Sequence, residues 1–128
     1  MKLLVLAPEA VDAAAVRNAL PGDDLDGAEV LVVSPALNPS GIRFWMSDSD
    51  DAIQRAEEAS AETAGALRSE GAHARATTGE SEPLLAIQDA LATFPADRIV
   101  VFRGDGDAYK EEDLAGADER FGVPVTMV

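Results

Sequence analysis

Three apolar runs of the sequence end near residues 7, 33 and 102. Residues able to contact a small ligand stand at or just after each of these ends. A proline and an acid stand at the first of these points, a serine at the second, and an arginine beside a glycine-rich turn at the third. Serine and arginine donate hydrogen bonds, and glycine lets backbone N–H groups approach a phosphate. The candidate contacts are Ala7, Pro8, Glu9, Val33, Ser34, Arg103, Gly104 and Gly106.

Two of these candidates allow more than one interpretation. The Ser34 hydroxyl either hydrogen-bonds a ligand or caps its own turn. The Gly104 to Gly106 segment resembles the start of a dinucleotide Gly-x-Gly-x-x-Gly motif, but Tyr109 occupies the third glycine position, which favours a simple turn. Arg103 is the only cation near enough to this turn to pair with a phosphate.

The sequence offers few residues for catalysis or for metal binding. The chain has no cysteine, and its single histidine, His73, begins an expected edge strand without any Gly-x-Ser-x-Gly nucleophile elbow. Asp105, Asp107 and either Glu111 or Glu112 could offer oxygens to Ca²⁺ or Mg²⁺, but they lack the spacing of a calcium loop, which favours a solvated acidic turn. We therefore predict no catalytic residue and no metal site; weak ATP hydrolysis stays open as an alternative.

The charge balance limits the partners of the protein. Asp and Glu number 24 against 10 Lys and Arg, so the formal net charge is −14. Such a field repels nucleic acid and anionic membrane surfaces, and no apolar run has the roughly 18–20 residues of a membrane span. We expect a cytoplasmic protein, whose acidity reflects either salt adaptation or genome composition.

Apolar runs alternate with helical patterns along the chain. The continuous apolar run 2–7 is typical of a strand buried on both faces of a parallel sheet. We therefore expect an α/β fold, a three-layer doubly wound sheet of five parallel strands, in a single domain over residues 1–128. Such sheets bind ligands beyond the carboxyl ends of their strands. The expected strands cover residues 2–7, 28–33, 72–78, 98–102 and 123–128.

The longest expected helix runs from about Asp50 to Glu70, because apolar or small residues recur there every three or four positions. Its expected buried stripe is Ile53, Ala56, Ser60, Thr63 and Leu67. Shorter helices are expected after Asp12, after Ser81 and from about Lys110 to Arg120.

A long segment rich in proline and serine, residues 35–49, precedes the longest helix. It contains Phe44, Trp45 and Met46, a large share of the aromatic content of the chain. These three residues are either a hydrophobic plug under the helix or a contact for a protein partner or ligand.

Four segments together resemble the universal stress protein family, within the adenine-nucleotide alpha-hydrolase-like group. They are residues 2–6, the glycine-acid-proline helix entry at 79–87, the Ala-Asp-x-Ile-Val-Val strand at 96–101 and the Val-Pro-Val strand at 123–128. The resemblance implies a flavodoxin-like layout with strand order 3-2-1-4-5 and a cytoplasmic stress-response role. It also implies a homodimer through the last strands, with Val123, Val125 and Met127 as contributors.

ATP-binding members of this family carry Gly-x-x-Gly, nine residues, then Gly-Ser or Gly-Thr after the fourth strand. Gly106 and Gly116 keep the nine-residue gap, which adds Gly116 to the candidate contacts. However, Arg103 replaces the first glycine, Ala117 replaces the hydroxyl residue, and Pro8 stands where the family has an acid. The sequence thus predicts a divergent member with a degenerate nucleotide pocket.

Two functions follow as hypotheses. The first is a non-catalytic stress-response or regulatory protein that acts as a homodimer, whose last strand is an edge open to pairing with another copy. The second is an adenine-nucleotide binding module, which holds ATP or AMP at the carboxyl ends of the first and fourth strands. No cofactor is expected under the first hypothesis.

Overall fold

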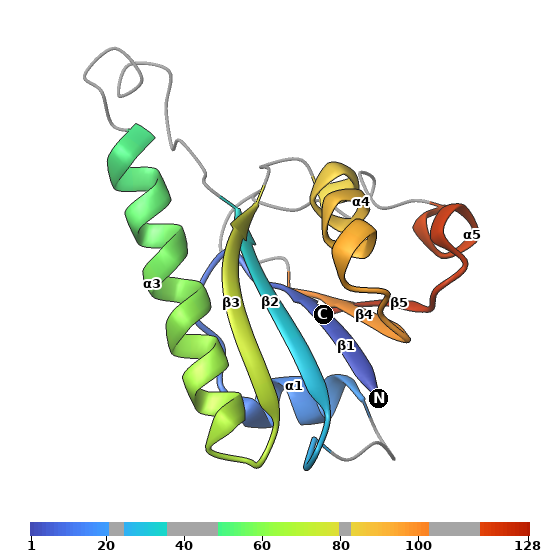
Figure 1. Ribbon diagram of the computed structural model, residues 1–128, viewed down its shortest axis with the longest axis horizontal. Helices are drawn as coiled ribbons and strands as arrows, with labels where there is room; N and C mark the ends of the chain where they lie inside the picture. Colours follow the sequence, from blue (N-terminus) through green and yellow to red (C-terminus); the bar gives the residue numbers. More distant parts are fainter. Residues whose placement is uncertain (21–24, 36–48, 80–82, 103–115) are drawn as a thin grey trace.

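The computed structural model describes residues 1–20, 25–35, 49–79, 83–102 and 116–128. These residues form one sheet of five parallel strands in the order β3-β2-β1-β4-β5, flanked by helices (Figure 1). The elements are β1 (Lys2–Leu6), α1 (Ala13–Ala19), β2 (Glu29–Pro35), α3 (Ser49–Arg68), β3 (His73–Gly79), α4 (Pro83–Thr93), β4 (Arg98–Val101), α5 (Ala117–Phe121) and β5 (Val125–Met127). The predicted fold class and strand order are confirmed.

Strand β1 lies in the centre of the sheet, which explains its unbroken apolar sequence. Leu3 and Val5 pack in one buried cluster with α1 and α3, whereas Leu4 and Leu6 pack in a second cluster with α4 and α5. All four side chains are fully buried. Burial of each side chain stabilises the fold by about 1.5–3 kcal/mol. Because successive side chains of a strand point to opposite faces, this stabilisation is divided between the two faces of the sheet.

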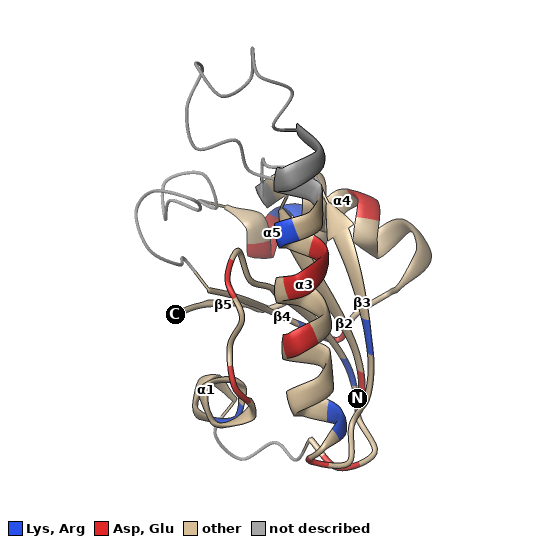
Figure 2. Cartoon of the chain, turned by 90° about the vertical axis from the view of Figure 1, so that its left-hand side faces the viewer, with Lys and Arg blue, Asp and Glu red and all other residues tan. Residues whose placement is uncertain are grey.

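Helix α3 has the buried stripe that the sequence predicts. Its described acidic residues, Glu57, Glu58 and Glu62, are exposed, and Figure 2 shows acidic residues along the helix. The predicted stripe residue Ile53 lies outside the described side chains. Among the described side chains, the predicted buried residues Ala56, Ser60, Thr63 and Leu67 are all buried. Gly71, with φ of +89°, ends the connection to β3 in the left-handed region that favours glycine. No helix in the described ranges combines the length and the apolar character needed to cross a membrane.

Two predicted boundaries are wrong. Helix α5 begins at Ala117 instead of near Lys110, because Gly116 has φ of +78°, a conformation that the interior of a helix does not allow. Residues 110–115 lie outside the described residues. Strand β2 continues through Pro35, beyond the predicted end at residue 33, because its last two residues still pair with β3.

Gly79 at the end of β3 lets the sheet and α4 approach each other. A Cβ atom added there would lie 2.6 Å from Val33 Cγ1 and 3.7 Å from the Cβ of Ala86 in α4. We expect Gly79→Ala to lower the free energy of unfolding by about 1–3 kcal/mol, because Val33 is buried and must shift. Urea unfolding measures this change.

The matched control is Gly65→Ala in α3, where an added Cβ meets nothing within 4 Å. Removal of a glycine from a helix interior raises stability by up to about 1 kcal/mol. An equal gain in both variants, or no loss for Gly79→Ala, would show that the close approach is not needed.

Candidate functional site

The candidate site lies where the carboxyl ends of β1, β2 and β4 meet. The order of the strands reverses beside β1, and an open α/β sheet forms its ligand crevice at this position. The N–H of Ala7 donates to the carbonyl of Val33 at 3.0 Å, and the N–H of Phe102 donates to the carbonyl of Leu6 at 2.8 Å. The three strand ends are thus joined by backbone hydrogen bonds.

Ser34 adds a side-chain bond to this junction. Its hydroxyl donates to the carbonyl oxygen of Ala7 at 2.5 Å, and the residue is fully buried. The hydroxyl therefore ties β2 to the end of β1, while the turn that it was expected to cap continues into residues 36–48, outside the described residues. Because the hydroxyl proton is already donated to Ala7, the Ser34 oxygen can only accept further hydrogen bonds.

Beyond Ala7 the chain becomes progressively exposed. Ala7 is buried, Pro8 is half-buried and Glu9 is exposed. Pro8 has no N–H to offer, so the first donor after β1 comes from a later residue. Among the described candidate residues only Glu9 carries a charge, and a carboxylate accepts hydrogen bonds but repels phosphate.

Thr63 of α3 positions the loop that carries these residues. Its Oγ1 accepts a hydrogen bond from the N–H of Val11 at 3.0 Å and donates to the carbonyl of Ala59 at 2.9 Å. The next residue of the loop, Asp12, caps α1 by accepting from the N–H of Ala15 at 2.8 Å. The Asp12 cap agrees with the sequence prediction.

The sequence analysis placed Thr63 in the buried stripe of its helix but missed this role. The only signal was the residue type, because a fully buried threonine needs a partner for its hydroxyl. Which backbone group supplies that partner depends on how α3 packs against the loop after β1. Nothing in the local sequence specifies it.

The remaining candidates divide into two groups. Gly116 is exposed and precedes α5 in the left-handed conformation, where an added Cβ would meet nothing within 4 Å. As a ligand contact it stays a prediction. The other predicted contacts lie outside the described residues, and these are Arg103, Gly104, Gly106, Phe44, Trp45 and Met46.

The described part of the site is mainly apolar and carries a single charge. Ala7 and Val33 are buried, so the surface that these residues offer comes from the half-buried Pro8 and the exposed carboxylate of Glu9. No group of three or more histidine, aspartate or glutamate side chains able to hold a metal ion occurs within the described residues. This combination fits an uncharged ring or sugar better than a phosphate chain.

Comparison with known proteins supports the fold. No protein-family model matches the chain, and no curated protein is similar to it. The universal stress protein from Archaeoglobus fulgidus is similar in structure, with a TM-score of 0.63 and 21% identity over 99% of this chain and 92% of that one. Its complex with dAMP gives a TM-score of 0.62 and 23% identity, over 99% and 96% of the two chains.

A universal stress protein family protein from Arabidopsis thaliana with AMP bound is similar at a TM-score of 0.55 and 14% identity, over 100% of this chain and 90% of that one. The chain therefore has the fold of the universal stress proteins, as the sequence resemblance implied. At these identities, the comparison shows the architecture alone.

We expect Thr63→Val to lower the free energy of unfolding by about 1–3 kcal/mol, because it leaves the Val11 N–H without its acceptor. Hydrogen exchange at the Val11 amide should also become faster. Thr63→Ser keeps the hydroxyl and is the control, with an expected loss of only about 1 kcal/mol for one methyl group. Equal losses for both variants would mean that packing, not the hydrogen bond, holds the loop.

Proposed function

We propose that the chain is a cytoplasmic, non-catalytic regulatory protein that binds an adenine mononucleotide at the carboxyl ends of β1 and β4. The observation that carries this proposal is the junction of three strand ends at Ala7, which lies at the edge where a doubly wound sheet generally binds its ligand. Two structural neighbours of the chain have dAMP and AMP bound, which supports the same class of ligand here.

The groups at the strand ends favour the nucleoside end of such a ligand. The N–H of Ala7 and the hydroxyl of Ser34 donate within the protein, and Pro8 has no N–H. None of these groups is left to donate to a phosphate. The exposed Glu9 carboxylate has the right chemistry to accept a hydrogen bond from a ribose hydroxyl.

Electrostatics favour a monophosphate over a triphosphate. The chain carries a net charge of −14, and Glu9 adds a negative charge at the site itself. Each carboxylate about 4 Å from a phosphate costs about 1–4 kcal/mol, depending on the effective dielectric constant. Because a triphosphate is more highly charged than a monophosphate, this repulsion acts more strongly on ATP. A pocket degenerate for ATP is thus compatible with AMP binding.

Titration calorimetry with AMP and ATP tests the proposal. We expect AMP to bind at least about tenfold more tightly than ATP, a difference of about 1.4 kcal/mol. In Glu9→Gln the ratio of the two affinities should fall, because the local repulsion is removed. Glu57→Gln on the exposed face of α3 changes the net charge equally and should leave the ratio unchanged. Tighter binding of ATP, or no binding of either nucleotide, would refute the proposal.

A second candidate function is regulation through a homodimer, which the edge strand β5 favours. Val123, Val125 and Met127 are half-buried against the core cluster that faces α4 and α5. The N–H of Val128 donates to Val101 in β4, so the N–H of Met127, one residue earlier, points away from the sheet. The outward N–H of Val125 is instead bonded to the Asp118 carboxylate at 3.2 Å.

We expect sedimentation equilibrium at micromolar concentration to give twice the chain mass of 13.4 kDa. Met127→Pro removes the outward N–H from an edge position where proline is tolerated, and it should shift the mass toward one chain. Met127→Leu keeps the N–H and the apolar bulk and should remain dimeric. A monomeric parent protein, or equal behaviour of the two variants, would exclude pairing through β5.

A further inference from the structure

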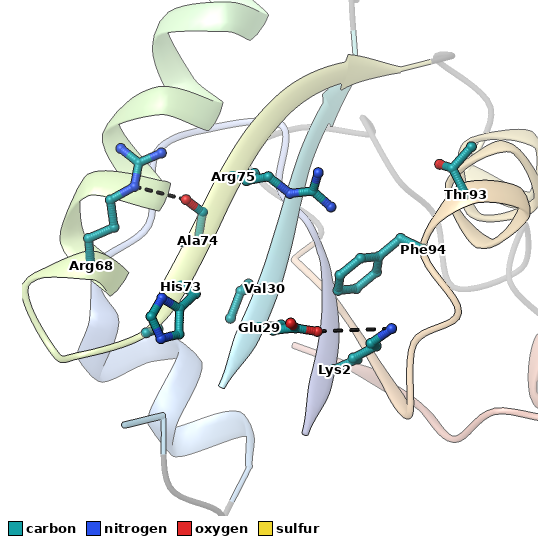
Figure 3. Close-up of a pocket in the computed structure, with 10 residues that line it drawn as sticks. Lys2, Glu29, Val30, Arg68, His73, Ala74, Arg75, Thr93 and Phe94 are labelled. Carbon is teal, nitrogen blue, oxygen red and sulfur yellow. Dashed lines mark hydrogen bonds and ion pairs between the residues drawn. The ribbon is translucent and has the colours of Figure 1, made fainter. Parts of the chain in front are cut away.

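A pocket lies at the opposite end of the sheet from the candidate site. It has a volume of about 580 Å³, within the range of small-molecule sites. Three of its lining residues, Lys2, Glu29 and His73, begin β1, β2 and β3 and lie side by side in the register of the sheet (Figure 3). The pocket therefore sits at the amino ends of the strands and shares none of the residues at Ala7.

The pocket is positively charged although the protein is strongly acidic. Lys2, Arg68 and Arg75 line it, and Glu29 is its one lining carboxylate. With His73 neutral, the lining carries a formal charge of +2, in a chain whose net charge is −14. Such a local excess of cations attracts an anion to this position against the mean field of the protein.

Phe94 lies close to two of the cations. The Lys2 Nζ lies 5.9 Å from the centroid of the Phe94 ring, and the Arg75 guanidinium carbon lies 6.0 Å from it. Figure 3 shows both side chains extending toward the ring from different strands. The ring itself is only 4% exposed, so it orients the cations and offers little surface on which a ligand could stack.

These cations are weakly neutralised. Within the described residues Arg75 makes no ion pair. Lys2 and Glu29 are 3.9 Å apart with both side chains about half exposed, a pair that contributes little. The Nε of Arg68 donates to the carbonyl of Ala74 at 2.8 Å, which leaves its terminal nitrogens for other acceptors.

The backbone beneath these side chains is held in place. The N–H of Lys2 donates to the Asp97 carboxylate at 2.9 Å, and the N–H of Asp97 donates to the carbonyl of Lys2 at 2.7 Å. The N–H of His73 donates to the carbonyl of Ala28 at 2.7 Å. A ligand would therefore meet cations whose strands are already positioned, which reduces the ordering cost of binding.

We propose that this amino-end pocket binds a small organic phosphomonoester through Lys2 and Arg75. Both cations line the pocket beside the Phe94 ring: the fork of the Arg75 guanidinium suits phosphate oxygens, and Lys2 adds a second positive charge that attracts the dianion. Glu29 repels the phosphate but accepts a hydrogen bond from a hydroxyl elsewhere on the ligand. The volume leaves room for that organic part.

The test is an NMR titration of the 15N-labelled protein with glycerol 2-phosphate at constant pH and ionic strength, with inorganic phosphate as a second probe. We expect saturable shifts of the Lys2, His73 and Arg75 amides, with the Ala7 and Ser34 amides unchanged. This pattern separates the pocket from the proposed mononucleotide site. No saturable shift at the three amides, or shifts confined to the carboxyl ends of the strands, would overturn the proposal.

Variants test whether the cations act locally. Arg75→Gln and Lys2→Gln should each weaken binding of glycerol 2-phosphate at least about fivefold, and unchanged urea midpoints will show that both variants are folded. The control Arg17→Gln alters the net charge equally at an arginine that pairs with Glu70 at 2.7 Å, outside the pocket. An equal loss in Arg17→Gln, or equally tight binding of succinate at the same amides, would overturn the proposal.

Discussion

The central position of β1 is the constraint on which the rest of the structure depends. This strand is paired on both edges and covered on both faces, so four successive side chains, from Leu3 to Leu6, are removed from water. Any polar side chain within it would need a buried partner. Groups able to bind a ligand therefore lie at the two ends of the strand. Lys2 lines the pocket at one end, and Ala7 lies at the junction of three strand ends at the other.

The two ends of the sheet differ in what they offer to a ligand. At the carboxyl ends, the described donors are used within the protein, and the exposed charge is the carboxylate of Glu9. At the amino ends, two cations converge on Phe94 with weak neutralisation. The net charge of −14 does not predict this difference, because it averages over the whole chain and cannot locate a small group of cations.

Buried hydroxyl groups connect the layers around the candidate site. Ser34 joins β2 to the end of β1, and Thr63 joins α3 to the loop that follows it. Both residues are fully buried, where a hydroxyl is costly unless it is bonded. Each bond crosses between elements far apart in the chain. The same side chains that look like candidate ligand contacts or plain core positions thus serve to align the strand ends.

The sequence by itself determined the α/β class, the strand order through its family resemblance, the buried stripe of α3 and the Asp12 cap, because apolar periodicity and capping act over short stretches of chain. It also located Ser34 but not the acceptor of its hydroxyl. Only the tertiary structure brought Lys2, Arg75 and Phe94 together, from three separate elements of the chain. Long-range packing decides such contacts, and no local sequence pattern predicts which side chains become neighbours across a sheet.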